Sequence, residues 1–166
     1  MTDKKSSERL RAWTFIVYPE SAPSNWREIL DEEHIEWAES PLHDKDINAD
    51  GSIKKPHIHV LLSFSGKKSY EQIKVITDKL NCPVPQKCHN QKSLVRYFCH
   101  LDNPDKAQYK TSEIIAHGGF NVEDVLKPSS SEVYEKIAEM IDYVRMYNVT
   151  EQRKPIVITI LNSIIH

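Results

Sequence analysis

Two histidines separated by one apolar residue, His57 and His59, stand in a strand-like run that continues to Phe64. Residues two apart on a strand point to the same face, so the two imidazoles would lie side by side, with Ile58 and Val60 facing the opposite way. Two neighbouring imidazoles can form half of a metal site. A histidine pair alone is about as compatible with the polar face of a half-exposed strand.

Residues that could complete a metal site precede this strand. His43 and Asp46 lie at the mouth of a predicted hairpin whose returning strand carries His57 and His59. Three imidazoles and one carboxylate can bind a divalent ion and leave positions open for a substrate. Asp44 is the alternative carboxylate; the spacing does not decide between the two, and we prefer Asp46. Taken singly, His43, Asp44 and Asp46 are each more typical of a solvated turn.

A tyrosine lies on a predicted helix that runs from Gln91 to about Leu101. On this helix Arg96, Tyr97 and His100 fall close together, because residues three and four apart are neighbours. A phenol can attack phosphorus when a metal and nearby positive charge neutralise the phosphate. The alternative is an amphipathic core tyrosine with its hydroxyl at the surface, and physical chemistry alone favours that alternative.

The elements that must position these residues follow from periodicity and capping signals. The pattern predicts strands over 11–18, 35–42, 54–64, 85–89 and 112–117, a short helix at 25–30, and helices over 69–81, 91–101 and 121–126. The capping signals are Asn25 with Glu28, Ser69 with Gln72, and Asn90. The order to residue 90 is that of a ferredoxin-like (split βαβ) fold, an α+β antiparallel sheet with flanking helices. We expect helices on one face and the chemistry on the other.

The length of 166 residues and a hydrophobic content of 39% predict one main domain, 1–127, followed by a small helical segment, 128–166. Ser129 with Glu132 could cap a helix with an apolar stripe, and the terminal run 156–165 is also apolar. These elements cannot bury much against each other, so we expect a homo-oligomer through this segment, which the chain end at His166 could leave incomplete.

No apolar run approaches the roughly 20 residues of a membrane span, and the first seven residues are polar. We therefore expect a soluble cytoplasmic protein without membrane partners. The three cysteines are odd in number and lack close pairs, which argues against a disulfide framework or a zinc ribbon.

Charge is unevenly distributed along the chain. The stretch 20–50 carries ten acidic and two basic residues, whereas 54–110 carries eleven basic and four acidic residues. The basic stretch contains the histidine pair, so a phosphate-bearing partner would meet positive potential near the proposed metal. A solvated lysine-rich surface is the alternative, and charge alone favours it.

Three stretches together resemble a known family. Residues 40–46 (Ser-Pro-Leu-His-Asp-Lys-Asp), 54–60 (Lys-Lys-Pro-His-Ile-His-Val) and 96–109 (from Arg-Tyr-Phe-Cys-His to Ala-Gln-Tyr) resemble the motifs of plasmid rolling-circle replication initiators. These belong to the HUH endonuclease superfamily, named for two histidines separated by a hydrophobic residue. The resemblance covers roughly residues 11–126, and segments placed like 128–166 tend to mediate oligomerisation in such proteins.

The resemblance implies a chemistry. His43, Asp46, His57 and His59 would bind Mn²⁺ or Mg²⁺, and Tyr97 would be the nucleophile that nicks single-stranded DNA at the plasmid origin. A 5′-phosphotyrosyl link would form, a free 3′-hydroxyl would prime replication, and the strands would be rejoined at termination. Tyr109 would then be a structural or DNA-contacting residue.

Basic side chains are expected to neutralise DNA phosphates and make binding sensitive to salt. The candidates are Lys54, Lys55, Lys67, Lys68, Lys92 and Arg96. Two other functions remain open at this point. One is a metal-dependent phosphoesterase that activates water and forms no covalent adduct, and the other is a non-catalytic DNA-binding module with a vestigial metal site.

Overall fold

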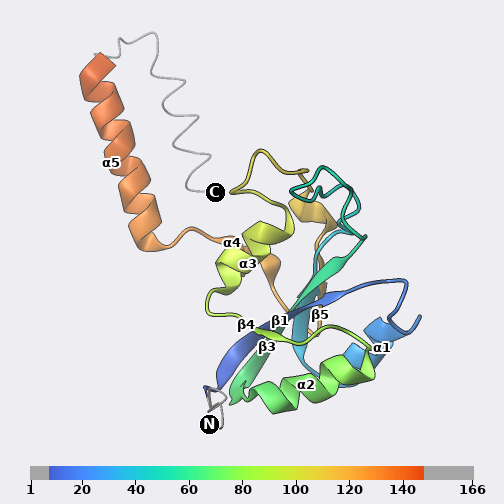
Figure 1. Cartoon of the computed structure of the whole chain (residues 1–166). Coiled ribbons are helices and arrows are strands. Elements are labelled where there is room, and N and C mark those ends of the chain that lie inside the picture. The colour runs from blue at the N-terminus through green and yellow to red at the C-terminus, as the bar shows by residue number, and fades with distance from the viewer. Residues whose placement is uncertain (1–7, 148–166) are drawn as a thin grey trace, which may run out of the picture. The chain divides into compact units, whose positions relative to one another are not determined.

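The computed structural model describes residues 8–147. Its elements are, in chain order, β1 (Leu10–Val17), α1 (Trp26–Asp31), β2 (Glu36–Glu39), β3 (Ile58–Lys68), α2 (Tyr70–Lys79), β4 (Gln86–Lys87), α3 (Gln91–Phe98), a 3₁₀ turn (Thr111–Glu113), β5 (Ile115–His117), α4 (Val122–Leu126) and α5 (Ser130–Tyr147). The strands form one antiparallel sheet in the order β4-β1-β3-β2-β5 (Figure 1). The first four strands have the ferredoxin-like arrangement, so the predicted fold class is confirmed, and β5 extends the sheet beside β2.

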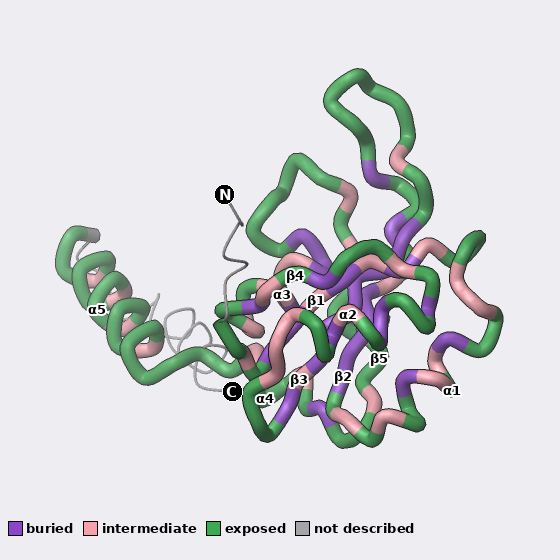
Figure 2. Tube along the Cα trace, turned by 60° about the horizontal axis from the view of Figure 1, so that its bottom comes forward, coloured by how far each residue is buried: buried purple, intermediate pink, exposed green. Residues whose placement is uncertain are grey.

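The longest strand, β3, lies at the centre of the sheet and is buried through most of its length (Figure 2). On one face, Ile58, Val60 and Leu62 pack with side chains of α1 and α2 in the larger apolar core. On the other face, His59 is followed two residues later by Leu61, which is fully buried. The alternation expected from the sequence is therefore present, with a polar end and an apolar middle on the second face.

Helices cover both faces of the sheet, not one as expected. The second apolar core joins Leu61 and Ala38 of the sheet to Val95 and Phe98 of α3, with residues of α4 packed around them. Figure 1 shows α1 and α2 on one side of the sheet and α3 and α4 on the other. The physical reason is Leu61, an apolar residue on the histidine face that needs a cover.

Local signals explain most element boundaries. Ser69 and Gln72 form the predicted capping box of α2, and the Asn90 side chain accepts a hydrogen bond from the Ser93 N–H at the start of α3. The Asn25 side chain makes no such bond, so the capping prediction for α1 is wrong. β2 ends at Glu39, shortly before Pro41, which has no N–H to donate to a ladder.

A buried charged cluster joins α1 to the edge of the sheet. Glu39 is 1% exposed and receives two hydrogen bonds of 2.7 Å from the Arg27 guanidinium. His117 of β5 lies 3.2 Å from the same carboxylate and stacks on the Trp37 ring. After β5, Gly118 has a φ of +60° and lies so close to the Ile35 backbone that any side chain would clash. These contacts fix β2, whose continuation leads into the histidine site.

The helix α5 begins with the predicted capping box. The Ser129 N–H donates to the Glu132 carboxylate at 2.6 Å, and the Glu132 N–H donates to the Ser129 hydroxyl at 3.3 Å. The chain divides into two compact units, one up to Leu126 and one from Lys127. The apolar run predicted at 156–165 lies outside the described residues. Among helices of the described part, none is long and apolar enough to cross a membrane.

Candidate active site

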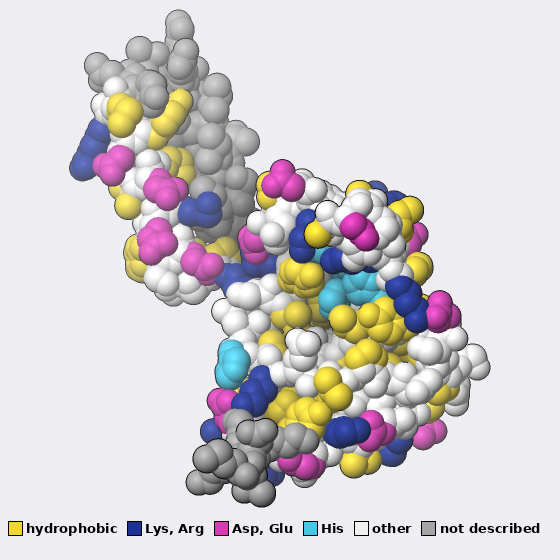
Figure 3. Space-filling view, viewed as in Figure 1, with side chains coloured by type: hydrophobic (Ala, Val, Ile, Leu, Met, Phe, Trp, Pro, Cys, Tyr) yellow, Lys and Arg dark blue, Asp and Glu magenta, His cyan; other side chains and the backbone are white. Residues whose placement is uncertain are grey.

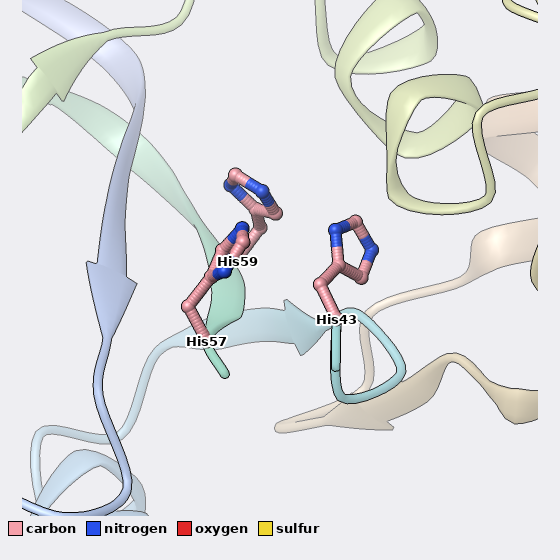
Figure 4. Close-up of side chains that lie close together, drawn as sticks. All are labelled: His43, His57 and His59. Atoms are coloured by element: carbon pink, nitrogen blue, oxygen red, sulfur yellow. The ribbon is translucent and has the colours of Figure 1, made fainter. Parts of the chain in front are cut away.

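The histidine site lies where the β2–β3 hairpin continues beyond its regular ladder. His43 and His57 form an isolated antiparallel bridge, with N–H to carbonyl distances of 2.8 and 3.2 Å between their backbones. This bridge places the His43 ring 5.3 Å from the His57 ring and 4.9 Å from the His59 ring, measured between centroids. Figure 4 shows the three imidazoles, two from one strand and one from the facing segment. The predicted hairpin therefore brings these three residues together.

Backbone carbonyls determine which ring nitrogens are available. His43 Nε2 lies 2.8 Å from the Phe98 carbonyl, and His57 Nδ1 lies 2.8 Å from the Lys55 carbonyl. A carbonyl only accepts, so both nitrogens carry the proton and leave His43 Nδ1 and His57 Nε2 as lone pairs. One ligand atom from each of His43, His57 and His59 can be chosen so that all three lie within 4.8 Å of one another. A hydrogen bond from the second ring nitrogen to a backbone carbonyl, as in His43 and His57, is typical of histidines that bind metals.

A carboxylate and a fourth histidine complete the cluster. Asp46 Oδ2 lies 3.4 Å from His43 Nδ1 and 3.7 Å from His100 Nε2. His100 Nδ1 donates to the Ala107 carbonyl at 2.7 Å, so its Nε2 also presents a lone pair. Asp46 is buried, whereas Asp44, the alternative carboxylate, is exposed. The geometry thus favours Asp46 as the carboxylate that faces the histidines.

His100 was not expected as a ligand. The sequence placed it on a helix reaching Leu101, but α3 ends at Phe98, and His100 adopts a φ of +54°. This left-handed turn brings the side chain into the buried cluster, where it is fully enclosed. The predicted helix already ended before Asn103-Pro104, and no local pattern in the sequence places its end at Phe98 instead of Leu101.

The cluster fits a divalent cation. His43 Nδ1, His59 Nε2 and His100 Nε2 are buried and have no hydrogen-bond partner among the described residues. Burial lowers the pKa of His59 to about 3 and also lowers that of His43, so both rings are neutral near pH 7. Neutral imidazoles are the form that binds metals, and a cation bound between the ring lone pairs and the carboxylate would compensate the charge of that buried carboxylate. Imidazole nitrogens and a carboxylate oxygen are both common ligands of divalent ions in proteins.

The candidate nucleophile lies against this cluster. Tyr97 is the penultimate residue of α3 and is half-buried. Its ring centroid lies 5.2 Å from that of His59 and 5.2 Å from that of His100. The Phe98 carbonyl that holds His43 belongs to the same helix. Helix α3 therefore fixes both the tyrosine and one edge of the histidine site.

Tyr109 supports the carboxylate. Its ring stacks on His43 with centroids 4.4 Å apart, and its hydroxyl lies 3.4 Å from Asp46 Oδ1 and accepts from the Lys45 N–H at 3.3 Å. Burial is the main reason why the pKa of Tyr109 is raised, so the phenol is protonated and can donate to Asp46. This contact makes Tyr109 a positioning residue for the site.

Comparison with known proteins assigns the family. Residues 5–123 match the family described as plasmid replication protein, origin binding domain. The chain belongs to this family. It is 44% identical over 150 residues to a replication protein of Staphylococcus aureus, covering 90% of this chain and 75% of that protein. It is 43% identical over 141 residues to the replication protein RepB of Lactiplantibacillus plantarum, covering 85% of this chain and 64%, just under two thirds, of that protein.

In this origin-binding domain the basic residues predicted to contact DNA do not form one group. Three of them are close in sequence to the histidine pair or to Tyr97. Lys54 lines a cavity beside Asp46, and Lys55 pairs with Glu20 at 2.5 Å. Arg96 donates to both carboxylate oxygens of Asp102 on the surface.

The other predicted basic residues lie elsewhere on the domain. Lys67 and Lys68 end β3, roughly 30 Å from its histidine end at about 3.3 Å per residue. Lys92 is in the first turn of α3. Figure 3 shows histidine side chains in a recess of the surface, with Lys and Arg side chains beside them.

Proposed function

We propose that this chain is the origin-binding and nicking part of a plasmid rolling-circle replication initiator of the HUH endonuclease superfamily. Family membership supports replication from a plasmid origin. The observation that carries the nicking activity is the position of Tyr97, whose ring lies 5.2 Å from two members of a buried cluster with unpaired nitrogens. A nucleophile beside a cation site is the arrangement that phosphoryl transfer requires.

The metal is Mn²⁺ or Mg²⁺ in this proposal. His43, Asp46, His57 and His59 would hold it, and His100 Nε2 is close enough to contribute. When bound, the ion would act as a Lewis acid that polarises the scissile phosphate. The residues behind the ligands hold the donors in place: the carbonyls of Phe98 and Lys55 orient the imidazoles, and Tyr109 orients the carboxylate.

The proposed reaction is a transesterification at one phosphodiester of the DNA. The Tyr97 hydroxyl oxygen attacks phosphorus, the bond from phosphorus to the 3′-oxygen breaks, and that oxygen leaves as the 3′-hydroxyl with a proton. The phenol proton passes to solvent or a base. The DNA 5′ end is now joined to the tyrosine, so the bond energy is conserved and a 3′-hydroxyl can later attack the link to rejoin strands.

In this proposal the partner is origin DNA that is single-stranded at the nick. Since plasmids replicate in the host cytoplasm, that is the proposed location. The residues from Lys127 onward form a separate unit whose helix α5 exposes Tyr134, Tyr143 and Met146. We propose that this unit joins copies of the chain into a homo-oligomer.

The test uses single-stranded oligonucleotides that tile the plasmid origin, incubated with the protein and Mn²⁺. We expect a covalent protein–DNA adduct that survives denaturation, is absent with Tyr97→Phe, and persists with Tyr134→Phe, a matched change at an exposed tyrosine of α5. Cleavage without an adduct would instead support a phosphoesterase that activates water. Binding without scission under any divalent ion would support a non-catalytic module.

A further inference from the structure

A small cavity opens beside the carboxylate of the candidate metal site. Its volume is about 100 Å³, and its wall includes Asp46 together with three lysines, Lys45, Lys54 and Lys106. Pockets that enclose drug-sized ligands measure roughly 300–1,000 Å³, so this cavity suits a much smaller group. Lysines from separate chain segments therefore converge on a space too small for a nucleoside.

Each of the three lysines makes a contact near the site, two through the backbone and one through the side chain. The Lys54 N–H donates to the Asp46 carbonyl at 2.7 Å, and the Lys45 N–H donates to the Tyr109 hydroxyl at 3.3 Å. The Lys106 ammonium lies 4.9 Å from the centre of the Tyr97 ring. The cavity wall thus includes the candidate ligand Asp46 and a lysine whose ammonium lies near the ring of the candidate nucleophile.

The lysines are also available for a ligand. Within residues 8–147, none of these three ammonium groups pairs with a carboxylate, whereas Lys74, Lys79 and Lys87 each do. Two carboxylates, Asp46 and Asp105, line the same cavity. Three positive and two negative charges leave a net charge of +1 before any cation binds to Asp46, and a bound cation would make it more positive.

We propose that this cavity, lined by Lys45, Lys54 and Lys106, is a subsite for one backbone phosphate of single-stranded DNA. Lysine side chains attract a phosphate without reading a base, so the subsite would position the strand beside Tyr97. The inference rests on the proposed function in that it takes single-stranded DNA as the ligand. It does not depend on cleavage.

The test measures binding alone. A fluorescein-labelled twelve-nucleotide oligo-dT is titrated with the full chain in EDTA, and anisotropy gives the affinity at several salt concentrations. The variant changes Lys45→Gln, Lys54→Gln and Lys106→Gln together. The matched control changes Lys74→Gln, Lys79→Gln and Lys87→Gln, which removes the same charge from lysines already paired with carboxylates. Circular dichroism verifies that both variants are folded.

If the three lysines share one phosphate, the slope of log K against log salt concentration should change by the amount expected for one contact. For single strands, log K falls with log salt by about 0.7 for each phosphate contacted, so the slope should weaken by about 0.7 and affinity at 0.1 M salt should fall about fivefold. The control should retain the wild-type slope. No change in slope would overturn the proposal, and so would a loss near 2, which means three separate contacts. Repeating the series with Tyr97→Phe should give the same loss, so this result is separable from failure of the nicking reaction.

Discussion

The neutral state of His59 makes a quantitative prediction about acid stability. Burial, together with the neighbouring histidines and Lys54, lowers the pKa of His59 from its ordinary 6.5 to about 3. The unfolded chain takes up this proton as the pH falls below about 6.5, whereas the folded protein does not until about pH 3. Protons bound only by the unfolded state lower the free energy of unfolding, so stability falls with pH through this window.

The magnitude follows from the size of the window. Between pH 7.5 and pH 5.0 the relevant span is about 1.5 pH units below 6.5, and each unit is worth about 1.4 kcal/mol. His59 alone should therefore cost the metal-free protein about 2 kcal/mol of unfolding free energy at pH 5.0. His43, whose pKa is also lowered by burial, acts in the same direction.

Urea unfolding in EDTA at the two pH values measures this loss. The His59→Gln variant should lose about 2 kcal/mol less than the wild type over the same interval, because the glutamine does not titrate. His89→Gln, a change at an exposed histidine, should lose as much as the wild type. Equal losses in the wild type and in His59→Gln would refute a buried, neutral His59.

Three further substitutions test how the site is supported. Tyr109→Phe removes the hydroxyl that faces Asp46; because that contact is long, the Mn²⁺ dissociation constant measured by calorimetry should rise about tenfold, the low end for supporting residues. Arg27→Ala leaves the buried carboxylate of Glu39 without its main partner and should cost about 2–3 kcal/mol in urea unfolding, partly recovered by adding Glu39→Gln. Asn90→Ala removes the cap of the nucleophile helix and should cost about 1 kcal/mol, whereas Asn90→Asp should retain most of it.

Alternation and capping were sufficient to predict the framework of the site. His57 and His59 share a face because a strand repeats every two residues, and the hairpin brings His43 opposite to them. The fold class also followed from the order of elements up to residue 90, whereas the place of β5 beside β2 did not. These features depend on local chemistry, which a single sequence displays directly.

Other parts of the site depend on contacts distant in sequence. His100 reaches the cluster through a left-handed turn, and Lys106 lies over Tyr97 only because the loop after α3 folds back. The stacking of Tyr109 on His43 joins residues 66 positions apart. No periodicity predicts such contacts, since they arise from packing of the second sheet face under α3. The same packing explains why the expected open face is partly covered.

Mass spectrometry of the protein–DNA adduct can show directly whether Tyr97 attacks DNA beside the histidine cluster. The protein would be reacted with origin single strands and Mn²⁺, digested with nuclease and protease, and fragmented. We expect a nucleotide phosphate attached to the Tyr97 side chain. Attachment to Tyr109 or another residue, or complete cleavage without any modified peptide, would contradict it.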